Sequence, residues 1–75
     1  MTHEEFKQKF IALINWGWSG DYAAELTAQA NNDKICALVY KCVRSWADRW
    51  RVSEGDALIS LIKRGAFKCK KYAIN

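Results

Sequence analysis

Few side chains in this sequence could perform catalysis. His3 is the only histidine, and it falls in the first turn of an expected helix, where a general base would lack a fixed geometry. Two pairs of carboxylates, Glu4/Glu5 and Glu54/Asp56, also fall at expected helix starts, where acids stabilise the positive end of the helix dipole. The glycines are scattered and form no phosphate-binding loop. We therefore expect a protein that is not an enzyme and has no catalytic residues.

The three cysteines, Cys36, Cys42 and Cys69, lack the spacing of a metal site. Structural zinc sites use close pairs of Cys or His, whereas Cys36 and Cys42 would point about 120° apart on a helix. We expect Cys42 in the core, Cys36 at the core edge, and Cys69 exposed between lysines. An odd number of cysteines without a C-x-x-C pair favours reduced thiols and a cytoplasmic location. No metal and no cofactor are expected.

The tryptophans and the arginines near them are stronger candidates for a binding surface. Trp46 and Trp50 are one helical turn apart, and Trp16 and Trp18 flank Gly17. The simpler interpretation assigns all four indoles to the core, because a small domain must pack efficiently and aromatic side chains bury large areas. In the alternative interpretation, Trp50 and one of the two tryptophans near Gly17 are partly exposed beside arginines.

Partly exposed tryptophans suit a protein that binds another protein, because Trp and Arg are the residue types most enriched at binding hot spots. We therefore expect this chain to dock on a larger protein as a regulator or inhibitor. The residues expected to make the contact are Trp18, Arg49, Trp50 and Arg51.

The net charge of +4 is unevenly distributed and supports a second function. Residues 1–33 contain five acids and two lysines, a net charge of −3, whereas residues 34–75 contain ten Lys or Arg and three acids, a net charge of +7. A basic half favours an anionic partner. The residues expected to bind nucleic acid in this alternative are Lys41, Arg44, Lys63, Arg64, Lys68, Lys70 and Lys71.

Within this alternative, non-specific DNA or RNA binding is favoured over a sequence-specific helix-turn-helix. Recognition helices present their first turn to base edges. The helix that would take this role begins with Glu54 and Asp56, whose charges would meet the phosphates unfavourably.

Helix signals in the first half of the chain predict two helices. Thr2 and Glu5 form a T-x-x-E capping box, so the first helix should begin there. It should end within residues 15–20, where Gly17 suits a left-handed C-cap. A second helix is expected over residues 21–30, with a thin apolar face rich in alanine.

The second half of the chain predicts two further helices and a basic tail. A third helix over residues 33–50 follows from an apolar stripe with helical spacing, whose members are Ile35, Leu38, Val39, Cys42, Val43, Trp46 and Trp50. Arg49 lies beside this stripe and should extend along the core edge or pair with a carboxylate. Ser53 and Gly65 should cap a fourth helix over residues 54–64. The tail 66–75 fits a strand or a helix, with Phe67 and Tyr72 docking on the bundle.

Taken together, these patterns predict one all-α domain over residues 1–75, a compact bundle of about four short helices with a basic C-terminal tail. The apolar share of 51% excludes general disorder, and there is no proline to interrupt a helix. No apolar run is long enough to span a membrane, and charged residues occupy the place of a signal peptide. A homodimer is also expected, with the alanine-rich helix and residues 16–18 as its contacts.

Overall fold

The computed structural model describes residues 2–67, and this part of the chain contains four α-helices and no strand. The helices are α1 (His3–Gly17), α2 (Gly20–Asn31), α3 (Asp33–Trp50) and α4 (Glu54–Lys63). The predicted all-α class is confirmed. The bounds of α3 agree with the prediction, α2 is longer than predicted by one residue at each end, and α4 ends one residue earlier than predicted.

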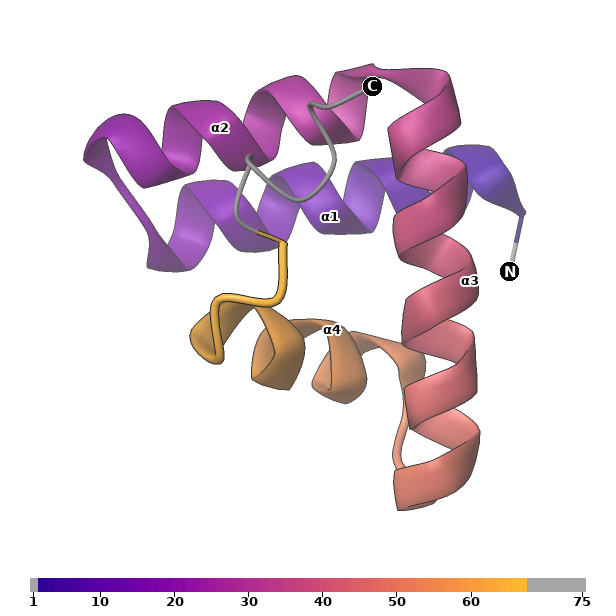
Figure 1. The fold of residues 1–75 in the computed structure, drawn as a ribbon. Coiled ribbons are helices and arrows are strands. Elements are labelled where there is room, and N and C mark those ends of the chain that lie inside the picture. Colours follow the sequence, from indigo (N-terminus) through magenta and orange to yellow (C-terminus); the bar gives the residue numbers. More distant parts are fainter. Residues whose placement is uncertain (1, 68–75) are drawn as a thin grey trace.

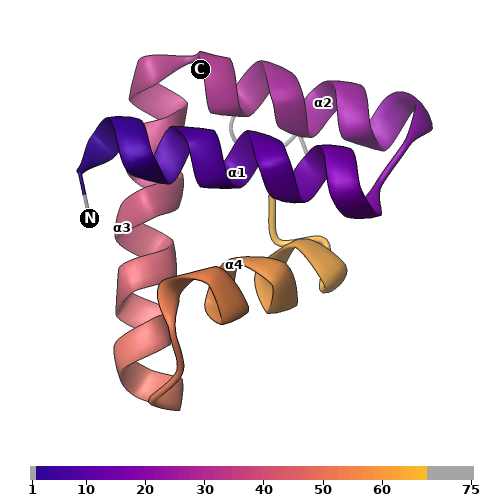
Figure 2. The ribbon, with the colours of Figure 1, turned by 180° about the vertical axis from the view of Figure 1, so that it is seen from behind.

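The first two helices form an antiparallel pair, and the third crosses the end of that pair (Figure 1). α4 returns from the far end of α3 and runs along α1 on the side away from α2, so that α1 lies between α2 and α4 (Figures 1 and 2). α1 and α3 each pack against all three other helices. The α3–α4 corner is thereby held against the α1–α2 pair.

All four helices contribute to one hydrophobic core. Its buried residues are Phe6, Phe10, Ile14, Leu26, Ala30, Cys36, Val39, Val43, Ala47, Ala57, Leu58, Leu61, Ile62 and Phe67. Burying a large apolar side chain stabilises a fold by about 1.5–3 kcal/mol, so this set is the main source of stability. The predicted docking of Phe67 is confirmed, because its side chain is fully buried. The predicted docking of Tyr72 lies outside the described residues.

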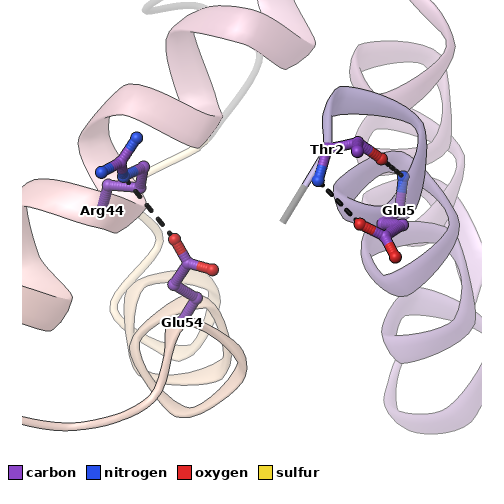
Figure 3. Close-up of polar contacts among 4 residues, drawn as sticks. All are labelled: Thr2, Glu5, Arg44 and Glu54. Carbon is purple, nitrogen blue, oxygen red and sulfur yellow. Dashed lines mark hydrogen bonds and ion pairs between the residues drawn. The ribbon is translucent and has the colours of Figure 1, made fainter.

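Side-chain hydrogen bonds cap the starts of α1, α3 and α4, whereas the start of α2 at Ser19 has no such bond. The Glu5 amide donates to Thr2 Oγ1 (3.1 Å), and the Thr2 amide donates to Glu5 Oε1 (2.8 Å), which completes the capping box (Figure 3). The bond from the Thr2 amide is the main reason that the pKa of Glu5 lies below its usual value. Asn32 and Ser53 cap α3 and α4 through their side chains.

The end of α1 differs from the prediction that Gly17 is a left-handed cap. The chain leaves α1 through Trp18, which is extended (φ −134°) and whose amide donates to the Ile14 carbonyl. Gly17 does not have a positive φ, whereas Gly20 does. The prediction was wrong because an extended residue after the helix also turns the chain toward α2, and it places the Trp18 ring against the core edge.

The end of α4 agrees with the prediction for Gly65. Gly65 has φ +72°, its amide donates to the Ile62 carbonyl (2.9 Å), and the Ala66 amide donates to the Leu61 carbonyl (3.0 Å). This pair of bonds is the Schellman motif, which satisfies the last helix carbonyls. The turn then directs Phe67 back into the core.

The buried face of α3 is rotated relative to the predicted stripe. The fully or nearly buried residues of α3 are Cys36, Val39, Val43 and Ala47, whereas Leu38 is 54% exposed. Cys36 is therefore in the core and Cys42 is half-buried, the reverse of the prediction. The helical spacing identifies the apolar residues, but the positions of α1, α2 and α4 decide which of them are covered. Small side chains at Cys36 and Ala47 allow this close packing.

Gln29 of α2 is a buried polar residue with a structural contact. It is 2% exposed, and its Nε2 donates to the Phe67 carbonyl at 2.6 Å. Its Oε1 has no hydrogen-bond partner in the described part of the chain. This bond ties α2 to the segment after α4, two regions far apart in the sequence.

Candidate functional site

Two indoles pack against each other at a tilt where α3 ends. Trp46 and Trp50 are one turn apart on α3, and their ring centroids are 4.8 Å apart with the planes inclined at 35°. Both rings are half-buried and pack against the core from its edge. Each indole is thus held by the fold while part of it stays accessible.

An arginine lies over each of these indoles. The Arg49 Cζ is 5.2 Å from the Trp46 ring centroid, and the Arg64 Cζ is 5.0 Å from the Trp50 ring centroid. Such cation–π contacts contribute about 0.5–1 kcal/mol each at exposed sites. We call the set Arg49, Trp46, Trp50 and Arg64 the arginine–tryptophan ladder. Of the two predicted positions of Arg49, the one along the core edge is confirmed, because its guanidinium lies over Trp46, which packs against the core from its edge. Arg49 forms no ion pair with a carboxylate within residues 2–67.

The arginines of the ladder differ from Arg44, which has a carboxylate partner. Arg44 Nε lies 3.7 Å from Glu54 Oε2, and this contact joins α3 to the start of α4 (Figure 3). It is the one ion pair within residues 2–67. The guanidinium groups of Arg49 and Arg64 are both exposed and have no carboxylate within ion-pair distance in the same part of the chain.

A shallow pocket adjoins the ladder at Arg64. It has a volume of about 450 Å³, is open to solvent, and is lined by Trp18, Tyr22, Ile62, Lys63, Arg64 and Gly65. We call it the α4 pocket. The half-buried rings of Trp18 and Tyr22 supply aromatic surface, and Lys63 and Arg64 supply positive charge. Because Arg64 belongs to both, the ladder and the α4 pocket form one continuous surface.

Tyr22 fixes the geometry of the α4 pocket. Its hydroxyl donates to the Ile62 carbonyl at 2.9 Å, which joins the start of α2 to the end of α4. Partial burial, and to a smaller extent the charge of Glu25, raises the pKa of Tyr22 above its usual value. The hydroxyl therefore remains a donor at neutral pH.

Three of the four residues predicted to bind protein lie on this surface. Trp18 lines the α4 pocket, and Arg49 and Trp50 belong to the ladder. Arg51 is exposed at the end of α3 and has φ +56°, a conformation that usually favours glycine. Trp16 is 80% exposed, and Trp18 and Trp50 are half-buried, so the expected partial exposure of Trp50 and of a tryptophan near Gly17 is confirmed.

Six residues of this surface were not among those predicted to bind protein: Tyr22, Trp46, Ile62, Lys63, Arg64 and Gly65. Trp46 was assigned to the apolar stripe, Lys63 and Arg64 to the nucleic-acid set, and Gly65 to a helix cap. The pairing of Trp46 with Arg49 has a local signal, because residues three apart share a helix face. The contact of Arg64 with Trp50 joins different helices and has no such signal.

The described residues of the nucleic-acid set are divided between two places. Lys41 and Arg44 are exposed on α3, and Arg44 contacts Glu54 at the start of α4. Lys63 and Arg64 lie at the other end of α4, about 15 Å away for a helix of this length. Three further members of the set, Lys68, Lys70 and Lys71, lie outside the described residues.

The cysteines form no metal site within residues 2–67, where no three His, Cys, Asp or Glu side chains are grouped to hold an ion. Burial raises the pKa of the Cys36 thiol, which lowers its reactivity. Cys69 is outside the described residues. No helix in the described part of the chain is both long and apolar enough to cross a membrane.

The chemistry available at the ladder and the α4 pocket is binding: guanidinium edges that can accept an anion, beside an apolar hollow. The contacts with the indole rings position both guanidinium groups. No family model, no curated protein and no solved structure matches this chain.

Proposed function

We propose that this chain is a non-catalytic cytoplasmic module that docks on a larger protein as a regulator or inhibitor, using the ladder and the α4 pocket. One observation carries the proposal. Two exposed guanidinium groups are stacked on half-buried indoles and have no carboxylate partner within residues 2–67. The buried, reduced Cys36 fits a cytoplasmic location.

The stacking favours tight binding because it removes conformational freedom before the partner arrives. An arginine that is free to rotate loses side-chain entropy when it is immobilised at an interface, about 0.5–1.5 kcal/mol. Arg49 and Arg64 are already restrained by the indoles, so less entropy remains to be lost. Trp and Arg are also the residue types that dominate hot spots in protein interfaces.

The same stacking makes the ladder a poor platform for nucleic-acid bases. Single-stranded nucleic acid binds by stacking bases on open aromatic faces. The indoles of Trp46 and Trp50 pack against each other at a tilt, and an arginine lies over each. The basic residues of α3 and α4 therefore support nucleic-acid binding through charge alone.

Capture and titration test the proposal. The immobilised full chain is exposed to a lysate of the cells that make it, beside the variant Arg49→Ala/Arg64→Ala and the control Lys34→Ala/Lys41→Ala. Both variants lose two positive charges, and the control removes exposed lysines of α3 outside the ladder. We expect a protein that the wild type and the control retain and the ladder variant loses.

A titration with generic DNA and RNA at two salt concentrations completes the test. Binding to phosphates weakens steeply with salt because counterions are released, whereas docking through the ladder should show a shallow dependence. Tight, salt-sensitive binding that the Lys34→Ala/Lys41→Ala control weakens as much as the ladder variant does would contradict the proposal and favour nucleic acid.

A further inference from the structure

The α4 pocket and the ladder differ in what they can recognise, and their junction at Arg64 limits the choice of ligand. Trp18 and Tyr22 give the pocket two half-buried aromatic rings, whereas the Ile62 side chain is buried beneath it. The exposed charged members of the lining, Lys63 and Arg64, are both positive and both belong to the end of α4 or its cap. A ligand that fits must combine an apolar group with negative charge on one side.

The positions of the charged residues determine where the negative groups of this ligand should lie on the surface. Glu25 follows Tyr22 by three positions on α2 and so lies on the same helix face, which makes the α2 side of the pocket less favourable for an anion than the α4 side. Lys63 and Arg64 make the α4 side favourable, and Arg49 continues the positive charge along the ladder. Negative groups of the ligand should therefore extend from the pocket over Arg64 toward Arg49.

Carboxylates fit the stacked arginines well. An arginine stacked on a ring keeps its N–H edge free, and this edge binds a carboxylate through two parallel hydrogen bonds. The pocket is also open and shallow, which suits a side chain of a polypeptide that runs across the surface more than an enclosed small molecule. Its volume of about 450 Å³ lies within the usual range for ligand sites.

We infer that the α4 pocket takes one aromatic side chain from an acidic peptide segment of the partner protein, and that neighbouring carboxylates of the segment bind Arg64 and Arg49. This inference rests on the proposed function and names the part of the partner that docks. The apolar lining gives the site its preference for an aromatic side chain, and the charge complementarity gives its preference for acidic neighbours.

Peptide titration followed by NMR tests the inference directly. The probe is the blocked peptide Gly-Glu-Asp-Phe-Glu-Asp-Gly, compared with one peptide in which Ser replaces Phe and another in which amides replace the acids. We expect the probe to shift the indole N–H signals of Trp18 and Trp50. Each matched peptide should bind at least about ten-fold more weakly, because it lacks one of the two features.

Two protein variants test whether the peptide binds at Arg64, which the α4 pocket and the ladder share. Arg64→Gln should weaken the probe at least about ten-fold, because it removes the guanidinium that both parts of the site share. Lys41→Gln makes the same change of charge on an exposed residue of α3 and should leave the affinity unchanged. Both residues are exposed, so both variants should fold, and circular dichroism checks this.

Several results would overturn the inference. These are the absence of any shift at millimolar peptide, equal binding of all three peptides, or equal effects of the two variants. If a short polyuridine binds more tightly than the probe and its binding depends on Arg64, the ligand of this site is nucleic acid and not a peptide. If the peptides fail while the Arg49→Ala/Arg64→Ala variant still loses a captured protein, the inference fails and the proposed function stands.

Discussion

The two ends of α4 differ in how their charges are satisfied. At the start, Glu54 forms an ion pair with Arg44 of α3. At the end, Lys63 and Arg64 have no carboxylate partner within residues 2–67, and Arg64 lies over the Trp50 ring. At the start of α4 the charge of Glu54 is thus paired within the chain and Asp56 is exposed, whereas the end presents two positive charges to solvent beside the α4 pocket.

This difference separates charges that serve the fold from charges that are available to a partner. The start of α4 needs the Ser53 side chain as its cap, and Glu54 suits the positive end of the helix dipole. The end is capped by backbone bonds around Gly65, so Lys63 and Arg64 are not required for capping. Unpaired charge beside half-buried indoles therefore identifies a candidate surface better than charge alone.

The largest expected effect is the loss of partner binding when the Arg64 side chain, at the end of α4, is truncated to alanine. Arg64→Ala should weaken binding of the captured partner by at least about 2 kcal/mol, the cost typical of a hot-spot residue. Its effect on stability should be smaller, about 0.5–1 kcal/mol, because the lost cation–π contact is exposed. Isothermal titration calorimetry measures the first quantity, and urea unfolding measures the second.

Arg64→Lys sharpens this prediction because it keeps the charge and removes the planar group. Lysine cannot make the same stacked, two-point contact, so most of the affinity should still be lost. Recovery of full affinity in Arg64→Lys would show that positive charge alone suffices. A stability loss as large as the binding loss would show that the end of α4 serves the fold as its start does.

Gly55 within α4 and Gly65 after its end should respond to alanine in opposite directions. Gly65→Ala should destabilise the fold by about 1–2 kcal/mol, because φ is +72° there and a Cβ is strained in that region. Gly55→Ala should stabilise it by about 0.5 kcal/mol through higher helix propensity. A Cβ at Gly55 would meet Lys9 Cε at 2.7 Å, but this exposed, flexible side chain can move.

Chemical denaturation of the two glycine variants measures both changes. A neutral Gly65→Ala would mean that the Schellman turn adjusts without cost, and the pocket wall it builds would then be less rigid than described. A destabilising Gly55→Ala would mean that Lys9 is held firmly over the start of α4.

The helix ends were predictable from sequence because their signals are local. Thr2 with Glu5, Ser53 and Gly65 each act within five residues, and each was placed correctly. Gly17 was the exception, because an extended Trp18 satisfies the same need for a turn. Local rules therefore gave the elements and nearly all of their bounds.

The candidate site was only partly predictable because its central contacts join distant residues. Arg64 reaches Trp50 on another helix, and the Tyr22 hydroxyl reaches the Ile62 carbonyl forty positions along the chain. The helical stripe of α3 also placed Leu38 inside, although packing leaves it exposed. Residue types indicated which side chains could bind a partner, and tertiary packing determined which of them meet.

A moderate effect on stability at high pH is expected from Tyr22, whose hydroxyl contacts the end of α4. Its pKa is raised in the folded state, so its contribution is fully present below the unfolded pKa of about 10 and is lost as pH rises through the higher folded pKa. Tyr22→Phe should cost about 1 kcal/mol at neutral pH through the lost hydrogen bond to Ile62.

Urea unfolding across the alkaline range tests the Tyr22 prediction. The variant should show a smaller decline in stability above about pH 10 than the wild type, because it has no phenol at this position to ionise. Parallel declines would contradict the role given to Tyr22, because they would show that groups present in both proteins cause the loss of stability.

The smallest expected effect is that of removing the ion pair between Arg44 and Glu54 at the start of α4. The contact is 3.7 Å long and the Arg44 side chain is 64% exposed, so solvent weakens the attraction. Arg44→Ala should cost about 0.5 kcal/mol of stability, less in high salt, and should leave partner binding unchanged. Unfolding at two salt concentrations and one partner titration measure both outcomes. If Arg44→Ala weakened partner binding as much as Arg64→Ala does, the docking surface would have to include both ends of α4, and internal pairing would no longer distinguish structural charges from binding charges.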